Sequence, residues 1–122
     1  MSQAIRLFCT QKMCSLLADV LRRYADAAYP RGGSECSQSA RESLLTSVEQ
    51  MLAAWDATSH SSRISRRLRV PVKSAIQYHA QRLEEEEGLP ANHRAAYLLG
   101  VLKGEVIDED GYHAAQQQDR FA

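Results

Sequence analysis

The fold is indicated most clearly by residues 39–55, which read SARESLLTSVEQMLAAW. The apolar side chains of this stretch recur at the spacing of one helical face; they are Leu44, Leu45, Val48, Met51, Leu52 and Trp55. Ser39 and Glu42 stand just before this stripe at the spacing of a capping box, which starts a helix. We therefore expect an amphipathic helix that begins at Ser39 and ends near Trp55.

A broader apolar stripe precedes this helix, over residues 3–28. Its members are Ile5, Phe8, Cys9, Met13, Leu16, Leu17, Val20, Leu21 and Tyr24. Tyr29-Pro30 and the glycines after it would end the helix, and a linker rich in Ser and Gly covers residues 30–38. The two stripes predict an antiparallel helical hairpin over residues 3–57.

The second half of the chain also has helical periodicity, and no stretch alternates as a strand does. We expect a short basic helix over residues 62–68, a turn at Val70-Pro71 and a helix over residues 71–87, closed by Gly88. Two further helices are expected within residues 90–118, over residues 90–103 and 109–118. Asp108 would cap the last helix. The prediction is an all-α fold of about five helices, in a single domain over residues 1–122.

The net charge of zero conceals a strong segregation of charge along the chain. Residues 1–62 carry equal numbers of acidic and basic side chains. Residues 63–83 carry only basic ones, namely Arg63, Arg66, Arg67, Arg69, Lys73 and Arg82. Residues 84–122 are strongly acidic and begin with Glu84, Glu85, Glu86 and Glu87. Opposite fields of this kind bear on association with partners and do not determine a fold.

Three features of residues 62–89 form a suggestive pattern: a basic stretch that ends in Leu68-Arg69-Val70, then Ser74, then Leu83. The segment resembles the helix-turn-helix of bacterial repressors of the winged-helix, GntR-like kind. Arg69 stands where that family has a turn glycine, and no wing follows Gly88. The resemblance implies a recognition face of Lys73, Ser74, Gln77 and Tyr78, with Arg63, Arg66, Arg67 and Arg69 on phosphates.

The acidic run suggests a different partner for the same arginines. Four carboxylates at the end of a helix oppose the helix dipole, and a basic surface would relieve that cost. Residues 84–87 could therefore pair with residues 63–69 of the same chain, of a second subunit or of another protein. In the first two cases the positive charge would be withdrawn from nucleic acid.

No arrangement of residues typical of catalysis is recognisable in the sequence. Cys9 and Cys14 are expected on different faces of the first helix, the histidines lack the spacing of zinc ligands, and His79 is expected in the core. We therefore predict no enzyme activity, no cofactor and no metal. The chain lacks a signal peptide and a membrane span, so we expect no membrane association and a cytoplasmic location.

These observations lead to two hypotheses on function. The first is a small, bacterial-type regulatory or inhibitory protein that acts by protein–protein binding, with charge complementarity selecting its partner. It would form a homodimer through the N-terminal helices. The alternative is a helix-turn-helix transcriptional regulator that binds DNA through residues 63–82. The residues expected to bind a partner under either hypothesis lie in the segments 63–82 and 84–87.

Overall fold

A computed structural model describes residues 3–121 of the chain as a mostly helical fold with one small sheet. The elements follow in the order β1 (Ala4–Phe8), α1 (Gln11–Ala28), α2 (Glu35–Ala54), β2 (Ser61–Ser65), η1 (Arg66–Leu68), α3 (Arg69–Glu87), α4 (Asn92–Leu99), η2 (Gly100–Lys103) and α5 (Glu109–Arg120). The elements η1 and η2 are short turns of 3-10 helix. The expectation of about five helices is confirmed, whereas the two strands were not expected.

The helical hairpin is formed by α1 and α2, with starting points that differ from the prediction. The Thr10 hydroxyl accepts a hydrogen bond from the Met13 amide (3.3 Å) and caps α1. The Ser34 hydroxyl accepts one from the Ser37 amide (3.2 Å) and caps α2. A hydroxyl in extended backbone at these positions satisfies an amide of the first turn. The second helix therefore begins before Ser39, and the linker is shorter than expected.

Residues 4–8 form a strand, so the expectation of one helix over residues 3–28 is wrong at its beginning. Ile5 and Leu7 alternate with Ala4 and Arg6, and this alternation places the two apolar side chains on one face of a strand. Ile5 also fits the apolar stripe of the following helix, whereas Leu7 is not part of that stripe. Thr10 separates the two structures, because its cap ends the extended backbone and starts α1.

The basic helix expected over residues 62–68 is also wrong. Residues 61–65 form β2, which pairs antiparallel with β1, and only one turn of 3-10 helix follows. Ser62 and Ile64 are buried on the inner face of the sheet, while Arg63 is exposed. Val70-Pro71 makes no turn and lies in the first turn of α3. A proline is accepted there because the amides of the first turn have no partner within the helix.

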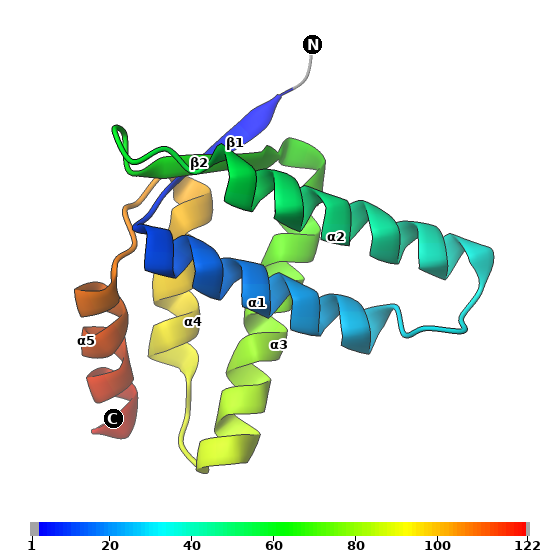
Figure 1. Cartoon of the computed structure of the whole chain (residues 1–122). Coiled ribbons are helices and arrows are strands. Elements are labelled where there is room, and N and C mark those ends of the chain that lie inside the picture. The colour runs from blue at the N-terminus through cyan, green and yellow to red at the C-terminus, as the bar shows by residue number, and fades with distance from the viewer. Residues whose placement is uncertain (1–2, 122) are drawn as a thin grey trace.

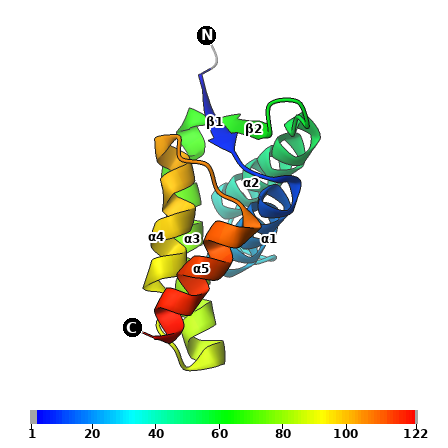
Figure 2. The same cartoon turned by 90° about the vertical axis from the view of Figure 1, so that its left-hand side faces the viewer.

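The helices pack in two layers, with the sheet at one end (Figures 1 and 2). In Figure 1 the helices α1 and α2 lie side by side, α1 crosses over α3 and α4, α2 crosses over α3, and α5 packs beside α4. Fully buried side chains from α1, α2, α3 and α4 meet between the layers, including Leu17, Leu21, Val48, Ile76 and Leu98. The apolar stripes of α1 and α2 are thus covered within the chain.

The C-terminal part follows the prediction at its helix ends. Gly88 and Gly104 have positive φ angles of 70° and 87° and end α3 and η2. The Asp108 carboxylate accepts a hydrogen bond from the Gly111 amide (2.7 Å) and caps α5, as expected. The helix expected over residues 90–103 divides into α4 and η2.

Candidate basic binding surface

The sheet places two arginines from distant parts of the sequence directly opposite each other. In the register of β1 and β2, Arg6 faces Arg63 and Ile5 faces Ile64. Ile64 points into the core, so the neighbouring Arg6 and Arg63 point to the other, exposed face. Like charges directly opposite in an antiparallel pair destabilise it. The outer face of this sheet therefore carries a concentration of positive charge that the fold does not need.

Two further arginines extend this surface where β2 passes into η1. Arg66 and Arg67 are both exposed. The Arg66 guanidinium donates a hydrogen bond to the side-chain oxygen of Gln3 (2.9 Å), and its amide donates to the Gln3 carbonyl (3.1 Å). We call Arg6, Arg63, Arg66 and Arg67 the basic surface.

No carboxylate of residues 3–121 forms an ion pair with the basic surface. The Arg6 guanidinium lies 5.7 Å from the centre of the Phe8 ring, on the same face of β1. Arg69 is not part of the basic surface. It lies at the start of α3, and its guanidinium donates a hydrogen bond to the backbone carbonyl oxygen of Leu102 in η2 (3.0 Å). The four guanidiniums of the basic surface are thus not neutralised by a carboxylate of residues 3–121, and Arg66 donates only to the neutral side chain of Gln3.

The acidic run lies at the other end of α3 and has partners of its own. Glu85 and Glu86 pair with Arg82 at 3.2 and 3.1 Å, and Glu87 pairs with Arg94 at 2.8 Å. Glu84 is exposed beside them. With a rise of about 1.5 Å per residue, α3 separates the run from the basic surface by nearly its whole length. The pairing of residues 63–69 with residues 84–87 within one chain does not occur.

The residues expected on a recognition helix do not join the basic surface. Tyr78 packs edge-on against Tyr24 of α1, with ring centres 6.3 Å apart. Gln77 lines a shallow hollow between α3 and α4, together with Pro90 and Leu99. Lys73 is exposed on α3. Of the predicted residues, the structure brings together Arg63, Arg66 and Arg67. Sequence reasoning missed Arg6, although the alternation of Ile5, Arg6 and Leu7 carried a signal.

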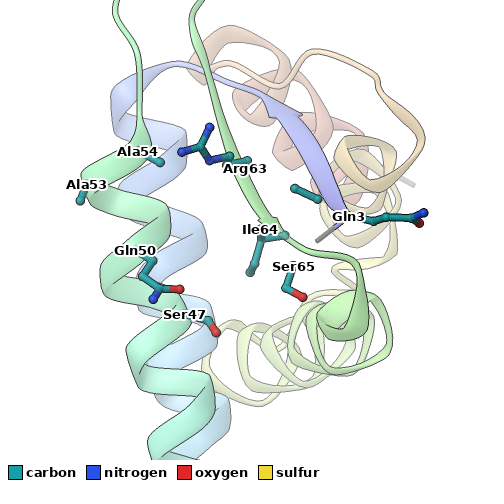
Figure 3. A pocket seen from close by; sticks show the side chains of 9 residues that line it. Gln3, Ser47, Gln50, Ala53, Ala54, Arg63, Ile64 and Ser65 are labelled. Carbon is teal, nitrogen blue, oxygen red and sulfur yellow. The ribbon is translucent and has the colours of Figure 1, made fainter. Parts of the chain in front are cut away.

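A groove of about 530 Å³ lies beside the basic surface, between α2 and β2. Its walls include Ser47 and Gln50 from α2, Arg63 and Ser65 from β2, and Gln3. Figure 3 shows Arg63 extending from β2 toward the end of α2, with Gln50 and Ser47 farther along the facing helix. None of the residues that line the groove is acidic.

The cysteines and His79 lie apart from this surface. Cys9 precedes α1 and is buried beside Cys14, so the expectation that the two occupy different faces of one helix is wrong. A hydrogen bond with Cys14, together with burial, raises the pKa of Cys9 and keeps its thiol protonated. His79 is buried as expected, with Nε2 3.1 Å from the Tyr112 hydroxyl. Burial lowers the pKa of His79.

The described residues hold neither a metal-binding cluster nor a helix that could span a membrane. Among residues 3–121, no three His, Cys, Asp or Glu side chains are grouped so that they could hold a metal ion. Within the same residues, every helix is too short or too polar to cross a membrane. No protein-family model, curated protein or solved structure matches the chain.

Proposed function

We propose that this chain is a non-enzymatic regulatory or inhibitory protein that binds an acidic partner protein through the basic surface. The observation that carries the proposal is that Arg6, Arg63, Arg66 and Arg67 are exposed and form no ion pair with a described carboxylate. Their mutual repulsion is a cost in the free protein, and a complementary partner removes it.

The charges around α3 support the same proposal. Arg66 and Arg67 lie at the N-terminal end of this helix and Glu84–Glu87 at its C-terminal end. Helix dipoles favour the reverse arrangement, so both ends carry charges of the unfavourable sign. An acidic partner at the N-terminal end would interact with the arginines and with the helix dipole together. The dipole contribution at an exposed helix end is about 0.3–1 kcal/mol.

The test compares a variant that removes positive charge from the basic surface with one that removes positive charge elsewhere. Arg66→Ala/Arg67→Ala removes half of the basic surface, while Arg31→Ala removes an exposed arginine of the loop before α2. Proteins retained by the immobilised chain at physiological salt are identified by mass spectrometry. The proposal expects an acidic protein that wild type and the Arg31 variant retain and the double variant loses. Equal retention by all three would refute it.

A second candidate function, nucleic-acid binding, is favoured by the shape of the sheet. The major groove of DNA admits a two-stranded antiparallel ribbon, and β1 and β2 present Arg6 and Arg63 on their outer face. This candidate replaces the expected recognition helix by the ribbon. In a salt-titrated mobility shift, Arg63→Ala should reduce the slope of log K against log salt by about 0.9. Nucleic-acid binding is the second candidate because the net charge of the chain is zero and the acidic run would repel phosphate.

The homodimer is a separate proposal, tested by light scattering across a range of protein concentrations. The large apolar side chains that are exposed among residues 3–121 are Val70, Val106 and Phe121. They lie outside α1 and α2, whose apolar stripes pack inside the chain. A dimer formed through the N-terminal helices would therefore use their polar faces. Its dissociation should respond to salt more strongly than that of an apolar interface.

A further inference from the structure

The backbone of β2 has one edge bonded to β1 and one edge that faces away from it. In an antiparallel pair, successive residues direct their amide and carbonyl groups alternately to the two edges. The Arg66 amide donates to the Gln3 carbonyl and the Cys9 amide donates to the His60 carbonyl, both at 3.1 Å. Residues 60, 62, 64 and 66 therefore face β1. Ser61, Arg63 and Ser65 direct their backbone groups to the outer edge.

This outer edge is occupied at one end and free beyond it. Ser61 exchanges two backbone hydrogen bonds with Asp56, at 2.8 and 3.4 Å, which confirms the direction of the alternation. No residue from 3 to 121 forms a hydrogen bond with the amide or carbonyl of Arg63. The free edge opens on the groove between β2 and α2, which Arg63, Ile64 and Ser65 line (Figure 3). An unpaired edge of this kind is a template for another strand.

We infer that an extended acidic peptide segment of a partner protein adds to β2 as a third strand, seated in this groove. The inference rests on the proposed function and specifies how the partner binds. Main-chain hydrogen bonds to Arg63 supply affinity, and side chains in the groove supply specificity. A glutamate or aspartate of the added strand meets the Arg63 guanidinium, which has no carboxylate partner among residues 3–121.

Charge disfavours the most obvious competitor for this edge, which is the β2 strand of a second copy. A two-fold axis at Arg63 would place the two Arg63 side chains directly opposite each other. Arg6 already faces Arg63 on the other side, so the dimer would gather four guanidiniums across neighbouring strands. Like charges in that position destabilise a sheet. An acidic strand would instead place a carboxylate beside Arg63, so the interaction across the outer edge would be an attraction.

The first experiment uses a short fluorescein-labelled peptide of alternating valine and glutamate, with binding followed by anisotropy. Single backbone amides of the peptide are methylated in turn. Only every second amide of an added strand faces β2, so methylation should weaken binding about tenfold at alternate positions and change it little between them. A peptide of alternating valine and lysine is the control and should not bind.

The second experiment observes the protein edge itself. The Arg63 amide should exchange rapidly with solvent in the free protein and at least about tenfold more slowly when the peptide saturates it. Arg63→Ala keeps the amide, so it should weaken binding and preserve the alternation with methylation. Arg63→Pro also removes the outward amide, at a position where an edge strand accepts proline. It should bind more weakly still.

The outcomes separate this inference from the proposed function. If the acidic peptide binds and Arg66→Ala/Arg67→Ala weakens it, but methylation has no alternating effect, strand addition is wrong and the basic surface stands. If no acidic peptide binds and the arginine variants change nothing, both are wrong. If Arg63 is protected without peptide in a dimer, a second copy occupies the edge and the inference is overturned.

Discussion

Arg94 and Asp119 form an ion pair in which both side chains are buried, with Arg94 Nε 2.8 Å from Asp119 Oδ2. The same carboxylate accepts hydrogen bonds from the backbone amides of His93 (2.8 Å) and Arg94 (3.3 Å) at the start of α4. The Arg94 guanidinium also reaches Glu87 at the end of α3 (2.8 Å). One arginine and one aspartate thus join α3, α4 and α5.

Replacing Asp119 should strongly destabilise the fold. Asp119→Ala leaves the Arg94 guanidinium buried without its inner partner and frees the first amides of α4, so we expect a loss of about 3–5 kcal/mol. Chemical unfolding measures this loss. Glu87→Gln is the control, because Glu87 is partly exposed and pairs with the same guanidinium. An equal loss of unfolding free energy in both variants would show that the buried Asp119 contributes no more to stability than the partly exposed Glu87.

Protonation of Asp119 should make stability depend on pH in the acid range. Burial raises the pKa of Asp119, but hydrogen bonds from Arg94 and His93 outweigh burial and hold the pKa below its ordinary value. The stabilisation is complete above the unfolded pKa of about 3.9 and disappears as the pH falls through the folded value. Between about pH 5 and pH 2, the free energy of unfolding should therefore fall more steeply with decreasing pH for wild type than for Asp119→Asn. Parallel curves would contradict this.

His79 should make stability depend on pH in the range nearer neutrality. Burial is the main cause that lowers the pKa of His79, and Arg23 and Arg94 act in the same direction. Glu86 and Glu87 oppose the shift, and Tyr112 contacts the ring. The unfolded chain therefore binds more protons, so stability is complete above about pH 6.5 and falls below it.

The measurement for His79 is the free energy of unfolding at about pH 7.5 and about pH 5.5. Wild type should lose stability on acidification, and His79→Gln should lose less. His113→Gln, at an exposed histidine of α5, is the matched control and should behave as wild type. An unchanged pH dependence in the His79 variant would assign the effect to another group.

Reversing the charge of Arg6 should have opposite effects on stability and on binding. Arg6→Glu replaces a repulsion with Arg63 by an attraction across the sheet, so we expect a gain of about 0.2–1 kcal/mol in the free energy of unfolding. The new carboxylate also competes with the acidic partner for Arg63 and should weaken binding. Arg6→Gln should lie between. A loss of both properties would indicate that the sheet itself is disturbed.

The three thiols should differ sharply in reactivity. Cys36 is exposed at the start of α2, whereas Cys9 and Cys14 are buried. A thiol-specific reagent should label one cysteine of the native protein quickly and the other two only on unfolding. Cys36→Ser should abolish the rapid phase. Rapid labelling of all three thiols would contradict the burial of Cys9 and Cys14.

Most of the helices could be predicted because their signals are local. The stripe over residues 44–55 requires only the helical period, and Asp108, Gly88 and Gly104 act on backbone within a few residues. The starting points of α1 and α2 were harder to predict. Ser34, Ser37 and Ser39 are all candidate caps near the start of α2, and apolar residues before Thr10 extend the stripe of α1. Which hydroxyl becomes the cap depends on how the chain enters the helix.

The sheet could not be predicted from the sequence, because it depends on tertiary contacts. Residues 4–8 fit a helical stripe as well as a strand, and residues 61–65 carry too few apolar side chains to indicate either. Each segment becomes a strand because the other supplies its backbone partners across a long separation in sequence. The opposition of Arg6 and Arg63, and with it the basic surface, arises only from that pairing.

The sequence by itself determined the helices and the separation of acidic from basic residues, because the helical period, the caps and the charges are properties of neighbouring residues. It did not determine which charges meet. The length of α3 and the partners Arg82 and Arg94 keep the acidic run away from the basic surface. Distances of this kind follow from packing, so only the tertiary structure decided that the arginines remain available to a partner.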